Sequence, residues 1–100
     1  MMYAFSYDAP GTAEVYRRIS EQIGTDQPPG LVVHVVTSTP RGLRHLNVWQ
    51  SREQWEAFRD TRVRPAVAEV VRQLGLPAPT EPPTEEALDL VDVTPQPVRS

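Results

Sequence analysis

The chain has 100 residues, enough for one domain, and its 13 acidic and 10 basic residues give a formal net charge of −3. The ten basic residues are all arginine, and no run of them provides the positive surface that a nucleic-acid partner requires. The absence of cysteine excludes disulfides, thiolate catalysis and cysteine-bound metal sites. No apolar stretch reaches the ~20 residues of a membrane-spanning helix, and residues 1–9 lack the pattern of a signal peptide. We therefore expect a cytoplasmic domain that binds neither nucleic acid nor a membrane.

Two elements are predicted in the first quarter of the chain. Residues 2–7 place aromatic side chains at alternate positions, a period of two that predicts a strand with these rings on one face. Residues 8–11 carry a turn signal, and Thr12 is a suitable N-cap for a helix. This helix has an apolar stripe at helical spacing and is expected to end at Gly24.

A hairpin is predicted in the middle of the chain. Residues 31–37 form a nearly continuous β-branched run, which is typical of a central strand covered on both faces. Residues 38–42 contain a proline and a glycine and are expected to form the turn. The third strand then spans residues 43–49, and one of its faces carries Leu43, His45, Asn47 and Trp49.

The second helix is expected to begin at Ser51, because Ser51 and Gln54 have the form of a capping box. Pro65 fits poorly inside a helix, so a break or kink is expected near Arg64, followed by a second helical piece that starts at Pro65 and ends at Gly75. The residues expected to be buried by the two pieces are Trp55, Phe58, Val63, Val67, Val70, Val71 and Leu74.

The C-terminal quarter is rich in proline. Residues 76–84 contain four prolines and predict a rigid connector, residues 85–93 predict a fourth strand, and residues 94–100 predict a frayed tail. The element order is therefore strand, helix, strand, strand, helix, strand, which is the order of an α+β, ferredoxin-like βαββαβ domain. We expect one such domain over residues 1–93, with an antiparallel sheet and helices on one face.

The other face of such a sheet is uncovered unless something packs on it. The apolar character of residues 31–37 and the presence of Trp49 both favour a covered second face. Two copies of the chain that stack their sheets face to face would provide this cover, so a homodimer is expected.

The run from Gly42 to Phe58 contains a strand that ends in Val-Trp, then a serine, an acidic residue and an aromatic residue on the following helix. Arg62 and Pro65 continue this pattern. Together with the element order, the run resembles the dimeric α+β barrel superfamily, in particular antibiotic-biosynthesis-monooxygenase-like proteins and actinobacterial members without a known activity. The resemblance covers residues 1–75 and implies a dimeric α+β barrel.

Several activities occur in the superfamily. Its monooxygenase members oxidise polyketide quinols without a cofactor, and an asparagine, a tryptophan and a few arginine or tyrosine residues line their pocket. Asn47 and Trp49 are the residues that this resemblance places in such a pocket. Other members degrade haem, bind haem, isomerise substrates or have no clear activity.

His45, Asn47 and Trp49 alternate on one strand, so their side chains are expected to lie ~7 Å apart on one face. A stacking indole and a hydrogen-bonding amide and imidazole could bind a planar, oxygenated aromatic ligand. Tyr7, at the end of the first strand, could add a phenol to this ligand site. The alternative is that Trp49 is a core or dimer contact and that the two polar residues lie near a rim.

His34 lies among valines and could act as a general base or a haem ligand, or it could be a neutral histidine that is hydrogen-bonded within the sheet. Residues 34 and 45 are nearly mirror-related across the hairpin turn, so the two histidines could be neighbours. A metal site would need a third ligand, which the sequence does not offer. No metal and no cofactor are expected.

Three functional hypotheses are compatible with these residues. The first is a homodimeric small-molecule-binding protein, specifically a cofactor-independent monooxygenase that acts on an aromatic or polyketide-type substrate, with His34, His45 and Asn47 as candidate catalytic residues. The second is a non-catalytic dimeric interaction or structural module. The third is a haem-binding or haem-degrading protein with His34 or His45 as the ligand.

Overall fold

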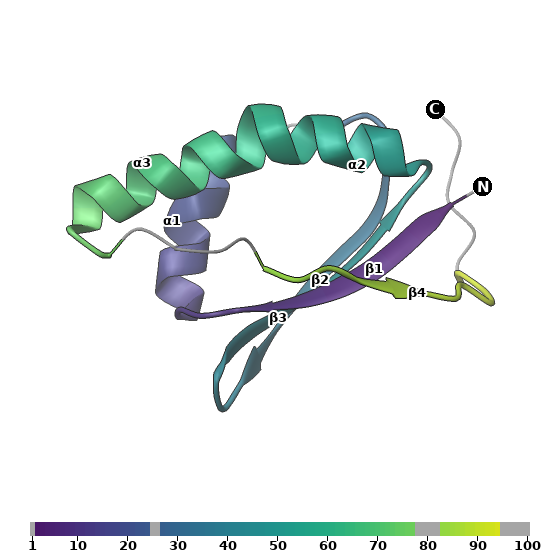
Figure 1. Ribbon diagram of the computed structural model, residues 1–100, viewed down its shortest axis with the longest axis horizontal. Helices are drawn as coiled ribbons and strands as arrows, with labels where there is room; N and C mark the ends of the chain where they lie inside the picture. Colours follow the sequence, from purple (N-terminus) through teal and green to yellow (C-terminus); the bar gives the residue numbers. More distant parts are fainter. Residues whose placement is uncertain (1, 25–26, 78–82, 95–100) are drawn as a thin grey trace.

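The computed structural model describes residues 2–24, 27–77 and 83–94. In this part of the chain an antiparallel sheet with the strand order β2-β3-β1-β4 carries the helices on one face (Figure 1). This arrangement confirms the predicted α+β, ferredoxin-like fold. The strands are β1 (Tyr3–Ala9), β2 (Leu31–Thr39), β3 (Gly42–Trp49) and β4 (Glu86–Leu88), and the helical segments are α1 (Ala13–Ile23), α2 (Arg52–Phe58), a π-helical turn η1 (Arg59–Val63) and α3 (Arg64–Leu74).

The register of the two central strands decides which side chains face the helices. Tyr3 pairs with Trp49, Phe5 with Asn47 and Tyr7 with His45. Because paired residues point to the same side of a sheet, the aromatic stripe of β1 and the predicted wall of β3 lie on one face. Phe5, Trp49 and Trp55 form the centre of the core on that face.

The predicted helix starts are confirmed by their caps. The Thr12 hydroxyl oxygen accepts a hydrogen bond from the Val15 backbone N–H at 3.3 Å, and the Ser51 hydroxyl oxygen accepts one from the Gln54 backbone N–H at 3.2 Å. Each bond satisfies an amide that would otherwise lack a partner in the first helical turn.

The helical layer has a wide turn where a break or kink was predicted. The backbone N–H of Arg64 bonds to the carbonyl of Arg59, five residues back, and Pro65 then occupies the first turn of α3. A proline has no N–H and its ring crowds the carbonyl four residues earlier, so a locally widened turn relieves the conflict. The helix therefore continues along one line instead of breaking (Figure 1).

The hairpin is tighter than predicted, because β2 extends to Thr39 and β3 starts at Gly42. Gly42 has a φ of 145°, and a Cβ atom at this position would lie 2.4 Å from the backbone carbonyl oxygen of Ala9. Only glycine allows the hairpin to approach the end of β1 this closely.

The fourth strand is much shorter than predicted, and the prediction of residues 85–93 was wrong in extent. β4 pairs with β1 only at Ala4↔Leu88, Phe5↔Ala87 and Ser6↔Glu86. Because β1 begins at Tyr3, the continuation of β4 beyond Asp89 has no strand to pair with. On the N-terminal side of β4, Pro83 has no backbone N–H to donate to a neighbouring strand, so pairing does not extend that far back. Much of the predicted connector, residues 78–82, lies outside the described residues, as does the tail after Thr94.

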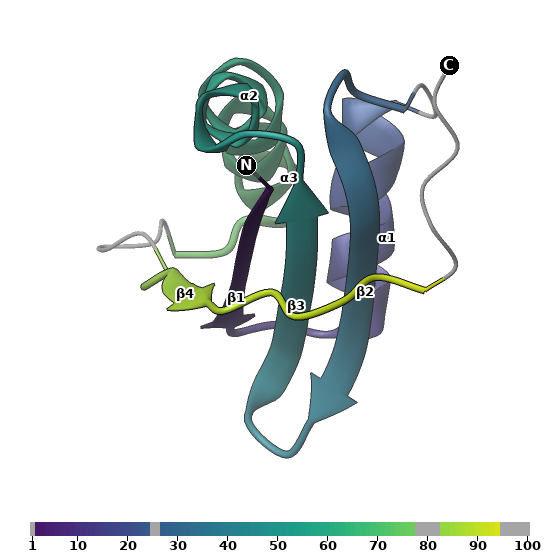
Figure 2. The ribbon, with the colours of Figure 1, turned by 90° about the vertical axis from the view of Figure 1, so that its right-hand side faces the viewer.

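The face of the sheet away from the helices is only partly covered in a single chain, because Ala4 and Val48 on it are buried but larger side chains around them stay exposed. Val33, Val35, Leu46 and Leu88 on this open sheet face are exposed, so β2 is not covered on both faces as its composition predicted. The prediction of a central position was also wrong, because β2 is an edge strand that pairs with β3 alone among the described strands. Figure 2 shows the segment after β4 crossing in front of this face, on the side opposite the helices. Val91 in that segment is 95% exposed, so it does not pack tightly on the sheet.

Candidate functional site

Polar side chains gather on the helix-facing side of the sheet beneath α1. β3 contributes His45 and Asn47, and its neighbours contribute Tyr7 from β1 and His34 from β2 through the pairs Tyr7↔His45 and His34↔Asn47. Tyr16 reaches down from α1, which lies over the β2 side of the sheet (Figure 2). We call these five residues the polar cluster.

The two histidines are in direct contact. His34 Nε2 and His45 Nδ1 lie 3.1 Å apart, which is the distance of a hydrogen bond. Their ring planes are only 17° from parallel. His45 is 6% exposed, whereas His34 lies on the edge strand β2 and is exposed. The pair therefore connects the interior of the domain with its surface.

Aromatic rings surround this pair. The Tyr7 ring stacks on His45 with a centroid separation of 4.5 Å and an interplanar angle of 13°. Tyr16 meets both imidazoles edge-on, at 5.5 Å from His45 and 6.2 Å from His34. The polar groups are thus enclosed by flat faces that suit an aromatic ligand.

The titratable members of the cluster are held in their neutral forms. Burial, with the charge of His34 as a second cause, lowers the pKa of His45 to about 4. The hydrogen bond to His45 is partly buried, and this desolvation lowers the pKa of His34 although its outer edge is exposed. Burial raises the pKa of Tyr7 and of Tyr16. At neutral pH the cluster therefore offers neutral imidazoles with an unprotonated ring nitrogen and phenols that keep their protons and can donate hydrogen bonds.

Asn47 has an unused hydrogen-bond donor. Its Oδ1 accepts a hydrogen bond from Trp49 Nε1 at 3.2 Å, which fixes the orientation of the amide. Its Nδ2 is buried and has no hydrogen-bond partner among the described residues. Leaving a buried donor unpaired costs about 1–3 kcal/mol, so a group that accepted this hydrogen bond would be favoured here.

Trp49 is a core residue. It is 1% exposed, and its ring centroid lies 5.5 Å from that of Trp55 and 5.4 Å from that of Phe58. The structure therefore brings Trp49 next to Asn47, as the strand alternation predicted, but leaves no open space beside the indole ring face that packs on α2.

The cover over the polar cluster is thin. α1 contains no fully buried residue, and its apolar side chains are only half-buried. A guanidinium nitrogen of Arg62 in η1 donates a hydrogen bond to the carbonyl of Ile23 at the end of this helix. α1 is therefore held at its C-terminal end and covers the cluster through half-buried side chains alone.

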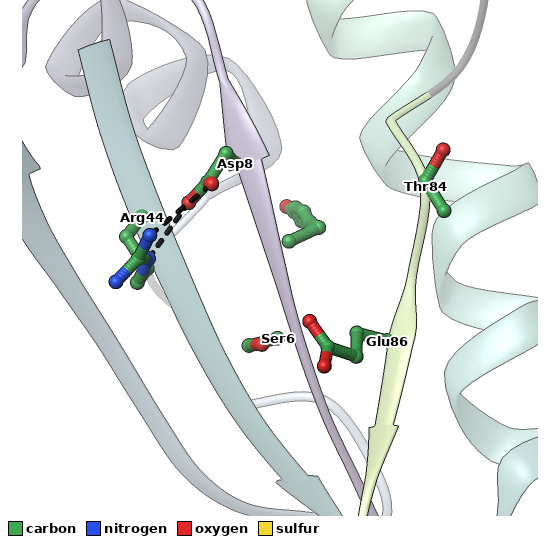
Figure 3. A pocket seen from close by; sticks show the side chains of 6 residues that line it. Ser6, Asp8, Arg44, Thr84 and Glu86 are labelled. Carbon is green, nitrogen blue, oxygen red and sulfur yellow. Dashed lines mark hydrogen bonds and ion pairs between the residues drawn. The ribbon is translucent and has the colours of Figure 1, made fainter. Parts of the chain in front are cut away.

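A surface hollow lies elsewhere. It measures about 430 Å³ and is lined by Ser6, Tyr7, Asp8, Arg44, Thr84 and Glu86, next to β1 and β4 (Figure 3). The Asp8 carboxylate and the Arg44 guanidinium within it form hydrogen bonds of 2.8 and 3.3 Å (Figure 3). Both side chains are more than half exposed, so the hollow is a hydrated surface without enclosed walls. Because binding sites for small molecules are enclosed, the polar cluster is the better candidate.

Sequence reasoning named four members of the polar cluster, together with Trp49, and missed Tyr16. Tyr16 belongs to the apolar stripe predicted for the first helix, and its position on that stripe was the available signal that it faces the sheet. Among the described residues, no group of three or more His, Cys, Asp or Glu side chains could hold a metal ion. Nor does any described helix have the length and apolar character needed to cross a membrane.

No protein-family model matches the sequence, and no curated protein matches it. The structure of a candidate antibiotic biosynthesis monooxygenase from Chloroflexus aurantiacus J-10-fl is similar, with a TM-score of 0.55 and 20% identity over 93% of this chain and 98% of that chain. The structure of Rv0793 from Mycobacterium tuberculosis has a TM-score of 0.49 and 16% identity over 93% of this chain and 97% of that chain. The first of these confirms the predicted resemblance at the level of the fold.

Proposed function

We propose that the protein is a homodimer that binds a planar, oxygenated aromatic molecule beneath α1 and oxidises it with dioxygen, without a cofactor. The observation that carries this proposal is the buried Nδ2 of Asn47, which has no hydrogen-bond partner among the described residues and lies on the same face as His45. A carbonyl or phenolate oxygen of the ligand would accept this hydrogen bond. The rings of Tyr7 and Tyr16 would flank the ligand's aromatic system.

The chemistry needs only a base and a fixed position. A neutral His45 can accept the acidic proton of a hydroxyanthrone, which leaves an electron-rich anion. This anion reduces dioxygen directly, so no metal or flavin is required. One oxygen atom becomes the new carbonyl oxygen in place of the CH₂ hydrogens, and the other leaves as water with those two hydrogens.

Entry of a ligand requires that α1 moves. His45 is 6% exposed and Asn47 is 3% exposed, so a ligand reaches them only if the cover over them opens. Neither residue lines the hollow beside β1 and β4 or the one at the turn between β2 and β3. The half-buried contacts of α1 make it the part of the cover with the least packing to lose. We expect hydrogen exchange in α1 to be slower with the ligand bound than without it, because the ligand adds contacts beneath this helix.

Oxidation of a hydroxyanthrone tests the proposal. We expect dioxygen uptake and a product that carries one ¹⁸O atom from ¹⁸O₂, detected by mass spectrometry. Asn47→Leu removes the unused donor at similar volume and should weaken binding about tenfold, the equivalent of one hydrogen bond. Ser38→Ala, an exposed change on β2, is the matched control and should bind as the wild type does. If the hydroxyanthrone neither raises the melting temperature nor is oxidised, the proposal fails.

The open sheet face supports the homodimer. Exposed Val33, Val35, Leu46 and Leu88 form an apolar surface of the kind that marks an interface. A second copy that stacked its own open face there would cover both surfaces by one self-complementary contact. Light scattering should give twice the 11.2 kDa chain mass, and Val35→Asp should give the single-chain mass. Gln73→Asp, on the exposed side of α3, is the control, and a single-chain mass for the wild type at micromolar concentration contradicts the dimer.

A non-catalytic dimeric module is the second candidate function. The tight packing of Trp49, which is 1% exposed, favours it, because this is the residue that an aromatic ligand would have used for stacking. A dimer that shows no thermal shift with hydroxyanthrones, flavins or haemin would support this module over the oxygenase.

A further inference from the structure

We propose that His34 and His45 form a proton conduit between the interior of the candidate site and solvent, in which His45 exchanges a proton with the bound ligand and His34 exchanges it with water. This inference rests on the proposed function for its substrate but concerns a property of the free protein as well. Its basis is the 3.1 Å contact between His34 Nε2 and His45 Nδ1. The difference in exposure gives the contact a direction, since His45 is 6% exposed and His34 lies exposed on the edge strand.

The transfer uses both nitrogens of each ring. A proton enters at His45 Nε2 as one C–H bond of the ligand's acidic CH₂ group breaks, and the proton on His45 Nδ1 passes to His34 Nε2. His34 then releases the proton on its Nδ1 to water, so both rings end neutral with their tautomers exchanged. The same route in reverse returns a proton when water forms from dioxygen, so the oxidation consumes no net proton and both tautomers are restored.

The environment favours passage of the proton over its retention. The titratable side chains that face His45 are Tyr7 from β1, Tyr16 from α1 and His34 from β2. None of the three is an acid that would stabilise an imidazolium in the interior. Burial lowers the pKa of His45 to about 4, so a proton taken there is favoured to move on to the more exposed His34. The ring of Tyr7, stacked at 4.5 Å, holds the imidazole plane in the orientation that the contact requires.

NMR of ¹⁵N-labelled imidazoles tests the conduit without any ligand. In the wild type we expect one proton shared between the two facing nitrogens and rapid exchange of the His45 N–H with water. In His34→Phe, which keeps an aromatic ring at this position, this exchange should be at least tenfold slower. His34→Gln is the second variant, because its amide oxygen can accept the hydrogen bond from His45 but cannot carry a proton onward. Slow exchange in both variants supports the conduit, and wild-type exchange in either of them overturns it.

Turnover of a hydroxyanthrone gives the second readout. His34→Gln should lower kcat by about 10–100-fold with little change in KM, since ligand contacts are preserved and a proton-transfer step is lost. Added imidazole should restore part of this rate, which a merely structural defect would not allow. If kcat of His34→Gln is unchanged, proton transfer through the two histidines plays no part in turnover. If the wild type shows fast imidazole exchange but no turnover, the proposed oxygenase function fails while the proton conduit stands.

Discussion

The helix-facing surface of the sheet has two halves that share β1 and β3 but are covered differently. Under α2, the packed half consists of Phe5, Trp49, Trp55 and Phe58, whose rings meet at centroid distances of 4.8–5.5 Å. Under α1, the polar cluster consists of histidines, tyrosines and an asparagine beneath a helix without a fully buried residue. Trp49 and Asn47 are only two positions apart on β3. Packing explains the large apolar ring of Trp49, but it does not explain a buried amide at Asn47.

This contrast teaches where to look for function in a thin domain. A small chain has little apolar surface to bury, so it cannot place buried polar groups in its core without a loss of stability. We expect the packed half to contribute most of the stabilisation of the fold, and the buried polar groups of the cluster to reduce that stabilisation. Substitutions placed in each half should therefore have effects of different size on the free energy of unfolding.

Trp49→Ala should cause the greatest loss, about 3–5 kcal/mol of the free energy of unfolding, because a large buried ring leaves a cavity in the packed half. Tyr16→Ala in the polar cluster should cost only about 1 kcal/mol, since that ring is half-buried. Urea unfolding followed by circular dichroism measures both values. Equal losses would mean that the packed half and the polar cluster contribute equally to the free energy of unfolding, which would contradict the proposed difference between them.

Acidification should destabilise the protein through the polar cluster. The folded pKa of His45 is about 4 and the unfolded pKa of a histidine is about 6.5, so the unfolded chain binds more protons between these values. Stability is therefore complete above pH ~6.5 and falls by about 2–3 kcal/mol as the pH drops toward 4, with His34 acting in the same direction. His45→Phe, compared with the wild type at pH 7.5 and pH 5, should reduce this fall. An identical pH dependence in the two proteins would rule out burial of neutral His45.

Glu85→Gln should have a moderate effect on the packed half. The Glu85 carboxylate accepts hydrogen bonds from Trp55 Nε1 at 3.1 Å and from Arg59 Nη1 at 3.3 Å, and it ties the chain before β4 to the helical layer. Glutamine keeps an acceptor for the indole but loses the charge, so we expect a loss of about 1 kcal/mol in urea unfolding. Glu86→Gln, an exposed change one residue away, is the control and should leave the midpoint unchanged.

Asp8→Asn should have the smallest effect. The ion pair of Asp8 with Arg44 lies in the hydrated hollow outside both halves, and such exposed pairs contribute little. The urea midpoint should not shift measurably at physiological salt. A clear destabilisation would show that the hollow on the open face contributes more than its exposure indicates.

Much of the fold could be predicted from local signals. The alternation in β1, the caps at Thr12 and Ser51, and the apolar run of β2 each follow from short-range rules. The extent of β4 could not be predicted, because it depends on where β1 begins, which is a property of the register and not of residues 85–93. An irregularity near Arg64 was predicted as a break or kink, but its form was not, since a wide turn at η1 lets the helix continue through Pro65.

The candidate site was predictable as a list of residues but not as an arrangement. Alternation placed His45, Asn47 and Trp49 on one face, and symmetry about the hairpin suggested that His34 lies near His45. Which of them would be sealed in the core depended on the position of α2 relative to α1. That position follows from tertiary packing, so the separation of Trp49 from the polar residues became visible only in three dimensions.

The wide turn at η1 has a consequence for how this chain is aligned with other sequences. The residues that α2, η1 and α3 turn toward the core are separated by three, five, three and four positions: Trp55, Phe58, Val63, Ala66 and Val70. The step of five is out of phase with a regular α-helix, which returns to the same face after three or four residues. A version of this helix one residue shorter within η1 would have steps of three, four, three and four and would bury the same face without any wide turn. A single-residue gap between Arg59 and Arg62 is therefore where we expect shorter sequences of this fold to differ in length from this one.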